Sequence, residues 1–150
     1  MTPRSCVSPD SNLPPAPRES ARRPRGVLVA DDNEFIRAIL DAGVRASGLT
    51  VWLAASGNEA VTCYHENRAE IDVLLLDVCM PDCDGPEALA AIRALAPTVP
   101  CCFMSSDLGH YTEEYLLGLG AVTVFQKPFR LPEMVGHLVR LATLTGTNES

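Results

Sequence analysis

The chain has 150 residues, of which 47% are hydrophobic and 21% charged, with a formal net charge of −7. This length suits one domain with a hydrophobic core, and the apolar fraction is too high for a fully disordered chain. No apolar run reaches the roughly 18 residues of a membrane span, and the N-terminus lacks a secretory signal. The acidic balance argues against nucleic-acid binding, which needs a positive surface. We therefore expect a cytoplasmic protein that binds neither membranes nor nucleic acid.

The first 25 residues differ in composition from the rest. Half of the 12 prolines lie there, and residues 1–26 carry five arginines against Asp10 and Glu19, which leaves a net charge of −10 for the remainder. Such a segment buries too little apolar surface to offset its ordering entropy. The sequence predicts a flexible tail over 1–25, a folded domain over 26–145 and a disordered C-terminus over 146–150.

From residue 26 onward, short apolar runs alternate with helical patterns. Strands are expected over 27–30, 50–54, 73–76, 101–104 and 121–125, and helices over 33–47, 56–67, 86–96, 111–119 and 131–144. Ser56 is expected to cap the second helix in a capping box with Glu59. Apolar strands separated by helices are typical of a parallel sheet covered on both faces. The predicted fold class is α/β, with a doubly wound five-stranded parallel sheet.

Polar residues follow four of the five expected strands. They are Asp31 and Asp32 after the first strand, Asp77 after the third, Ser105 after the fourth and Lys127 after the fifth. Each is common in turns or helix caps when taken alone. Because function in doubly wound sheets gathers at the carboxyl ends of the strands, their joint placement at one edge indicates a site.

The residue types at this edge point to phosphoryl chemistry. Three neighbouring carboxylates repel one another unless a cation is present, and hard oxygen ligands suit Mg²⁺, with Mn²⁺ as a substitute. Lys127 is the single lysine beside eleven arginines, and its ammonium can pair with a carboxylate or a phosphoryl oxygen. Ser105 supplies a hydroxyl to the same oxygen. The sequence predicts a site that stabilises a phosphoryl group on or near Asp77.

Four stretches of the chain resemble the response regulator receiver domain of two-component signalling, a likeness that spans about residues 26–145. They are Val27-Leu28-Val29-Ala30-Asp31-Asp32-Asn33, Leu74-Leu75-Leu76-Asp77-Val78-Cys79-Met80-Pro81-Asp82-Cys83-Asp84-Gly85, Met104-Ser105-Ser106 and Gln126-Lys127-Pro128-Phe129. The resemblance implies a flavodoxin-like (βα)5 fold with strand order 2-1-3-4-5.

The resemblance also implies a role for each site residue. Asp77 would be the phosphoacceptor, Ser105 the switch hydroxyl and Lys127 the ammonium that pairs with the phosphoryl group. Asp32, Asp77 and the backbone carbonyl of Cys79 would bind the metal directly, and Asp31 would act through water. The Lys127–Pro128 bond would be cis.

The implied activity is that of a signalling module and not of a conventional enzyme. A histidine kinase or a phosphotransfer protein would donate to Asp77, and the domain would catalyse only its own phosphorylation and dephosphorylation. The face over 111–144 would then change population between two conformers and contact an output protein. Because no output domain follows residue 145, we expect a stand-alone receiver. A phosphate sink or shuttle, or a degenerate receiver that acts only by binding, stays open.

Two departures from the family pattern are visible. Receivers usually carry Tyr or Phe three residues before the lysine, where this chain has Val124, and Phe125 should face the opposite side of its strand. Cys79 and Asp107 lie two residues beyond Asp77 and Ser105, at positions that vary among receivers. We hypothesise that Asp107 orients or admits the water that hydrolyses the phosphoryl group.

Two other classes with related folds fit the residues less well. A haloacid-dehalogenase-like phosphatase would carry a second aspartate two residues after the nucleophile, where this chain has Cys79. A flavodoxin-like carrier of FMN would need a hydroxyl- and glycine-rich loop after the first strand. The acidic run from Asp31 to Glu34 stands there instead and would repel an anionic phosphate.

Overall fold

A computed structural model describes residues 23–149 of the chain, with side chains described through Leu144. The strands are β1 (Gly26–Ala30), β2 (Thr50–Ala54), β3 (Val73–Asp77), β4 (Cys101–Ser105) and β5 (Thr123–Gln126). The helices are α1 (Glu34–Ala46), α2 (Gly57–Asn67), α3 (Gly85–Leu95), α4 (Glu113–Gly118) and α5 (Leu131–Glu149), with a short 3-10 helix, η3 (Arg68–Glu70). All strand pairs are parallel, in the order β2-β1-β3-β4-β5. The predicted doubly wound α/β fold and its strand order are confirmed.

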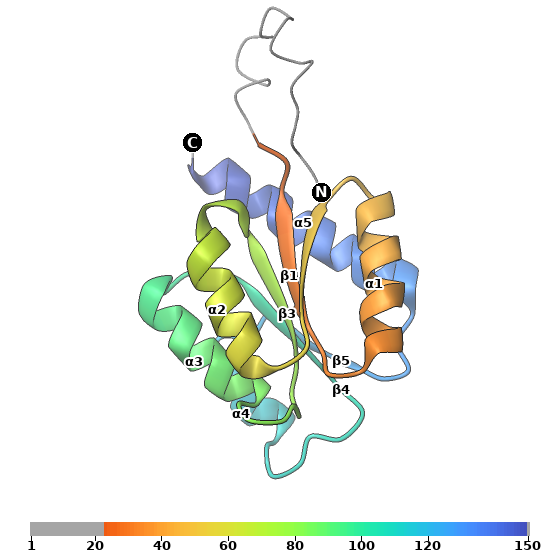
Figure 1. The fold of residues 1–150 in the computed structure, drawn as a ribbon, viewed down its shortest axis with the longest axis vertical. Helices are drawn as coiled ribbons and strands as arrows, with labels where there is room; N and C mark the ends of the chain where they lie inside the picture. The colour runs from red at the N-terminus through yellow and green to blue at the C-terminus, as the bar shows by residue number, and fades with distance from the viewer. Residues whose placement is uncertain (1–22, 150) are drawn as a thin grey trace, which may run out of the picture.

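The sheet has helices on both faces, α1 and α5 on one and α2, α3 and α4 on the other (Figure 1). Alternation along β1 shows how the sequence builds both cores: Val27 and Val29 face the α1 and α5 side, and Leu28 and Ala30 face the α2 and α3 side. All four side chains are buried. Strands apolar on both faces are therefore required here, as the sequence pattern indicated.

The element boundaries differ from the predicted ones at a few points. The last helix was expected to end near residue 144, but α5 continues to Glu149. Gly146 and its hydroxyl-bearing neighbours are weak helix formers, but they do not by themselves stop a helix that has already begun. At α2, Ser56 caps the helix as predicted, but the Glu59 carboxylate accepts the backbone N–H of Ala55 and not that of Ser56. A complete capping box lies instead at Asp84 and Glu87, which start α3.

The predicted N-terminal tail falls mostly outside the described residues, which begin at Arg23. Residues 23–25 lie against the fold: the Arg23 guanidinium pairs with Asp72, and the Arg25 carbonyl accepts the N–H of Thr50 at 2.8 Å. Among the described residues, no helix is both long enough and apolar enough to cross a bilayer.

Candidate functional site

The carboxyl ends of the central strands bring three aspartates together. Ala30, the last residue of β1, pairs with Leu76 in β3, so Asp31 directly follows β1 and lies beside Asp77, the last residue of β3. Asp32 is exposed, whereas Asp31 and Asp77 are buried. One carboxylate oxygen of each of the three residues lies within 4.8 Å of the other two. Three aspartates that the sequence predicted as site residues thus form one acidic cluster.

Lys127 links two of these carboxylates from the end of β5. Its ammonium Nζ lies 2.7 Å from Asp31 Oδ2 and 3.3 Å from Asp77 Oδ1. The backbone N–H of Lys127 donates to the Ser105 carbonyl at 2.9 Å, which fixes the chain at this point against β4. The Lys127–Pro128 peptide bond is cis, as the resemblance implied. Lys127 is therefore positioned between the Asp31 and Asp77 carboxylates.

The loop that carries Asp31 and Asp32 is held by backbone and side-chain hydrogen bonds. Asp31 Oδ1 accepts the N–H of Asn33 at 2.8 Å, and Asn33 Oδ1 in turn caps α1 by accepting the N–H of Phe35. The Arg37 guanidinium donates to the Asp31 carbonyl at 2.8 Å. Arg37 was missed from the sequence, because an arginine on the first turns of a helix carries no signal that it reaches back to the preceding loop.

The charges in this cluster do not balance. Burial and then the nearby charge of Asp31 raise the pKa of Asp77 from 3.8 to about 7, although Lys127 opposes the shift. Burial alone would lower the pKa of Lys127, but its hydrogen bond to Asp31 and the charge of Asp77 raise it above its ordinary value. The ammonium is thus present at neutral pH, and the negative charge of Asp77 is under-compensated.

The acidic cluster fits a divalent metal ion of the hard type. Its donors are carboxylate oxygens, and its exposed member, Asp32, leaves one side open to water. Mg²⁺ prefers such ligands and keeps several waters when one or two carboxylates bind it. A bound cation would also relieve the repulsion that raises the pKa of Asp77. The chemistry of the donor set therefore agrees with the metal that the sequence led us to expect.

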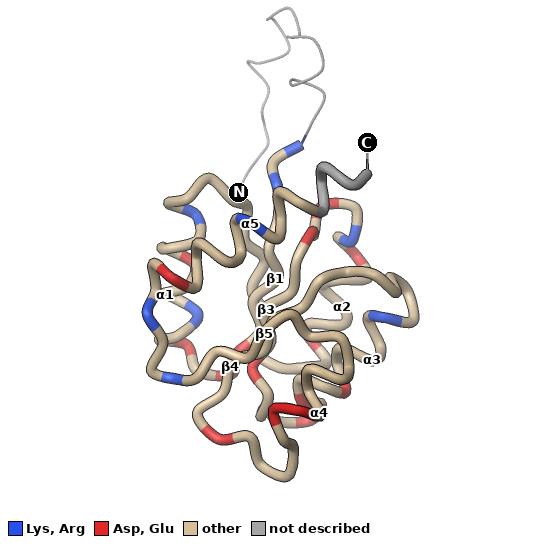
Figure 2. The backbone as a smooth tube through the Cα atoms, turned by 180° about the vertical axis from the view of Figure 1, so that it is seen from behind, with Lys and Arg blue, Asp and Glu red and all other residues tan. Residues whose placement is uncertain are grey.

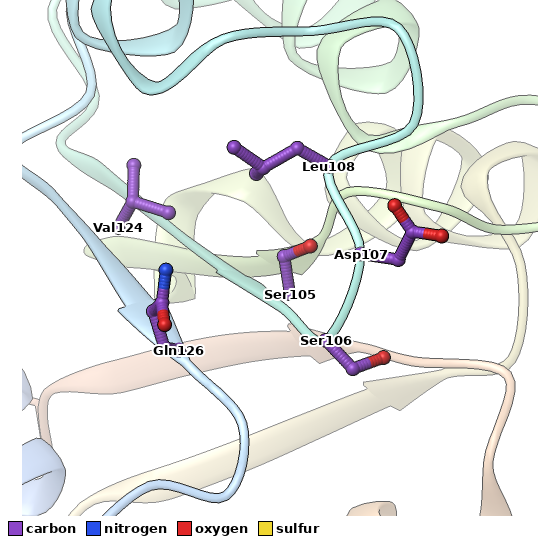
Figure 3. A pocket seen from close by; sticks show the side chains of 6 residues that line it. All are labelled: Ser105, Ser106, Asp107, Leu108, Val124 and Gln126. Carbon is purple, nitrogen blue, oxygen red and sulfur yellow. The ribbon is translucent and has the colours of Figure 1, made fainter.

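Ser105 ends β4 beside this cluster. Its hydroxyl is buried and has no hydrogen-bond partner among the described residues. The side chain borders a pocket of roughly 280 Å³, lined by Ser105, Ser106, Asp107, Leu108, Val124 and Gln126. Figure 3 shows Leu108 and Val124 on two sides of this pocket with Ser105 between them. An unpartnered buried hydroxyl beside free space is suited to bind a group that arrives later.

The structure places Val124 and Phe125 on opposite faces of β5. Val124 packs against the core under α2, α3 and α4, and Phe125 packs against the core under α1 and α5, where its ring meets His137 edge-on at 5.4 Å. The predicted opposite orientation of Phe125 is confirmed. A valine therefore borders the pocket next to Ser105, where receivers usually carry an aromatic ring.

Cys79 and Asp107 contact each other across the site. The Cys79 thiol donates to the Asp107 carbonyl at 3.2 Å, and the Asp107 carboxylate accepts the N–H of Gly109 at 2.9 Å. The thiol has a raised pKa because of burial and the surrounding acidic groups, so it stays protonated at neutral pH. Asp107 lies on the loop between β4 and α4, and Figure 2 shows acidic segments on this loop and on α4.

One contact near the site has no counterpart in the sequence-based predictions. The Tyr111 hydroxyl donates to Asp84 Oδ2 at 2.8 Å and joins the loop after β4 to the start of α3. Asp84 could be recognised only as part of an Asp-Gly turn. No pattern in the sequence indicates a partner for Tyr111, since the two residues lie 27 positions apart.

The structure is a doubly wound α/β domain with an acidic cluster at one edge of its sheet, and comparisons identify its family. The family model of the response regulator receiver domain matches residues 27–139. The chain therefore belongs to the response regulator receiver domain family. Receivers of this family accept phosphoryl groups, bind Mg²⁺ at an acidic pocket and interact with histidine kinases or phosphotransfer proteins.

Two curated relatives show how much of a longer protein the chain matches. It is 37% identical over 123 residues to the transcriptional regulatory protein PrrA of Mycobacterium tuberculosis, covering 81% of this chain and 51% of PrrA. It is 35% identical to part of the sensor kinase CckA of Brucella abortus, covering 72% of this chain and 11% of CckA. The chain thus spans about half the length of the PrrA relatives and a smaller part of CckA.

Two solved structures share this fold with 27% sequence identity to the chain. The CheX-CheY-BeF3-Mg complex from Borrelia burgdorferi matches with a TM-score of 0.72 and 27% identity, covering 78% of this chain and 88% of that one. The chemotaxis protein CheY4 of Vibrio cholerae matches with a TM-score of 0.70, also at 27% identity, covering 79% of this chain and 99% of that one.

Proposed function

We propose that this domain accepts a phosphoryl group on Asp77 from the phosphohistidine of a histidine kinase or a phosphotransfer protein. The observation that carries the proposal is the pairing of one ammonium, Lys127, with two buried carboxylates in a three-carboxylate cluster. A carboxylate oxygen of Asp77 attacks phosphorus, the bond from phosphorus to the donor nitrogen breaks, and the imidazole leaves. Phosphoryl transfer of this kind needs little beyond positioning and charge, which this cluster supplies.

The other site residues act by charge and hydrogen bonding. Asp32 and Asp77, with the backbone carbonyl of Cys79, would hold the Mg²⁺ directly, and Asp31 would act through water. When bound, the ion supplies positive charge that offsets both the carboxylates and the incoming phosphoryl group. Lys127 pairs with a phosphoryl oxygen, and the Ser105 hydroxyl donates to another, which gives that buried group the partner it lacks.

The output is proposed to pass through protein contacts on the face over 111–144. Exposed apolar side chains support this assignment: Tyr115 and Leu117 on α4 and Val122 before β5 are 53%, 42% and 47% exposed. Phosphorylation would shift the population of conformers of this face and so change its affinity for a partner. For Asp107, we propose that it orients the hydrolytic water, in line with its position on the loop after Ser105.

Incubation with acetyl phosphate and Mg²⁺, followed by intact mass spectrometry, tests the proposal. In this assay the Asp77 carboxylate attacks phosphorus and acetate leaves. We expect one added phosphoryl group that is acid-stable and base-labile, requires a divalent ion and is absent from Asp77→Ala. Asp82→Asn, which removes the charge of an exposed aspartate in the following loop and tolerates its positive φ of 61°, is the control and should still be phosphorylated. Incorporation into Asp77→Ala at the wild-type level would reject the assignment.

A further inference from the structure

Two hydrogen bonds tie the loop after β4 to the loop after β3. The Tyr111 hydroxyl donates to Asp84 Oδ2 at 2.8 Å, and the Cys79 thiol donates to the Asp107 carbonyl at 3.2 Å. The first loop begins at Ser105 and the second begins at Asp77. The ties therefore connect the segment that carries the proposed switch hydroxyl with the segment that carries the proposed acceptor.

The Asp84 end of the Tyr111 tie is fixed to the backbone of the acceptor. Asp84 Oδ1 accepts the N–H of Glu87 at 2.9 Å, and the Glu87 carboxylate accepts the N–H of Asp84 at 3.0 Å, which forms the capping box of α3. Gly85 packs so closely on β3 that a Cβ atom there would lie 2.4 Å from the Asp77 carbonyl oxygen. Asp84 is thus a rigid anchor adjacent to Asp77.

The Tyr111 end of the tie belongs to a short and ordered loop. The N–H of Tyr111 donates to the Leu108 carbonyl at 3.1 Å, and its ring stacks on that of Tyr115 with centroids 5.7 Å apart. Burial and the hydrogen bond to Asp84 raise the pKa of Tyr111 above its ordinary value, so the hydroxyl keeps its proton. A hydrogen bond to a carboxylate is among the stronger kinds, and this one is partly shielded from water.

The Ser105 hydroxyl is unpartnered among the described residues, and a pocket lies beside it. This hydroxyl is buried, and the pocket is bordered by Val124 and not by a large aromatic ring. Reaching a phosphoryl group on Asp77 would give the hydroxyl a partner, but the segment that carries it is held at Tyr111, six residues further on. The hydrogen bond between Tyr111 and Asp84 therefore opposes a displacement of this segment toward Asp77.

We propose that the Tyr111–Asp84 hydrogen bond holds the loop after Ser105 in its resting position, and that Tyr111 and Asp84 are positioning residues for phosphorylation of Asp77. This inference rests on the proposed function of the site. Breaking the bond removes stabilisation from the resting conformer alone, so the conformer that binds a phosphoryl group becomes more populated. The tie thus sets how readily this receiver is phosphorylated.

The test uses beryllofluoride, which stands in for a phosphoryl group on Asp77. Its affinity in the presence of Mg²⁺ is measured by fluorine NMR for the wild type and the variants. Tyr111→Phe keeps the stacked ring and removes the hydroxyl, and Asp84→Ser keeps a helix cap and removes the acceptor oxygen. We expect each to bind beryllofluoride roughly three- to tenfold more tightly, the range for one hydrogen bond to a carboxylate at a half-exposed position. The beryllofluoride affinity of the double variant should be no higher than that of either single variant, because both changes remove the same hydrogen bond.

Controls distinguish an effect of the Tyr111–Asp84 hydrogen bond from general loosening of the structure and from a failure of the proposed function. Tyr115→Phe makes the same chemical change on the stacked neighbour and should leave the affinity unchanged, and Mg²⁺ affinity should stay within about twofold in all variants. Unchanged or weaker binding in both Tyr111→Phe and Asp84→Ser, or additive gains in the double variant, would overturn the tie. Wild type that takes up neither beryllofluoride nor a phosphoryl group would instead reject the proposed function.

Discussion

Asp72 and Asp77 stand at opposite ends of β3, and their surroundings differ although both are buried. The Asp72 carboxylate accepts two hydrogen bonds from the Arg23 guanidinium, at 2.8 and 2.7 Å, and a third from the N–H of Gly26 at 2.8 Å. Among the residues that the structure describes, Asp77 has one ion-pair partner, Lys127 at 3.3 Å, and that ammonium lies closer to Asp31. The Asp72 carboxylate is therefore fully hydrogen-bonded and balanced in charge, whereas the Asp77 carboxylate is neither.

This difference separates a carboxylate whose charge is balanced from one whose charge is not. A buried charge is tolerated when it is paired and fully hydrogen-bonded, which is the situation of Asp72. At Asp77, Lys127 does not offset burial and the nearby charge of Asp31, which together raise the pKa of this carboxyl to about 7. A carboxylate in that state gains from any electropositive group that reaches it, whether a metal ion or the phosphorus of a donor. The imbalance is therefore a cost to stability that prepares the site for chemistry.

The largest expected effect is on the pH dependence of stability at Asp77. The unfolded chain releases this proton near pH 3.8 and the folded protein releases it near pH 7, so ionisation favours unfolding and stability is lost as the pH rises between these values. Asp77→Asn removes the charge. Its gain in unfolding free energy over wild type should grow from near zero at pH 4 to on the order of 4 kcal/mol at pH 8.

Urea unfolding at several pH values measures this gain. Asp72→Asn is the matched comparison at the other end of β3: it removes a balanced charge and should destabilise the protein at pH 8. Millimolar Mg²⁺ should narrow the gap between wild type and Asp77→Asn, because only the wild type presents the full set of carboxylates. A gap that is the same at pH 4 and pH 8 would show that Asp77 carries no charge penalty.

A smaller loss is expected at the balanced end of β3. Among the described residues, Arg23→Ala leaves the buried Asp72 carboxylate with the Gly26 N–H as its one remaining hydrogen-bond donor, and loss of one member of such a pair costs about 3 kcal/mol. The loss should appear in urea unfolding without any change in beryllofluoride affinity. Arg25→Ala, which has no recorded ion pair among the described residues, is the control and should cost less than about 0.5 kcal/mol. Equal effects of the two variants would refute a specific role for Arg23.

The sequence predicted the fold and the strand-end residues well because both depend on local patterns. Alternating apolar runs give the layers, and strand ends give the positions of Asp31, Asp77 and Lys127. Contacts between loops could not be predicted. The Tyr111–Asp84 hydrogen bond, for example, depends on the relative orientation of two loops that are distant in sequence. The Arg23–Asp72 pair was hidden for another reason: Arg23 lies in a segment whose composition indicated a tail, and a single buried partner overrides composition locally.

The smallest effect is expected at an exposed pair, which separates burial from distance in this comparison. Arg45 Nε lies 2.6 Å from Asp41 Oδ1 on α1, closer than Arg23 lies to Asp72, but the two side chains are 57% and 32% exposed. Water competes for both groups, so Arg45→Ala should cost no more than about 0.5 kcal/mol, and the loss should shrink as salt is added. The loss from Arg23→Ala should change little with salt, because Asp72 is shielded from solvent. If urea unfolding gave the same cost and the same salt response for both variants, contact distance and not burial would set the energy of these pairs, and the contrast between the two ends of β3 would need another cause.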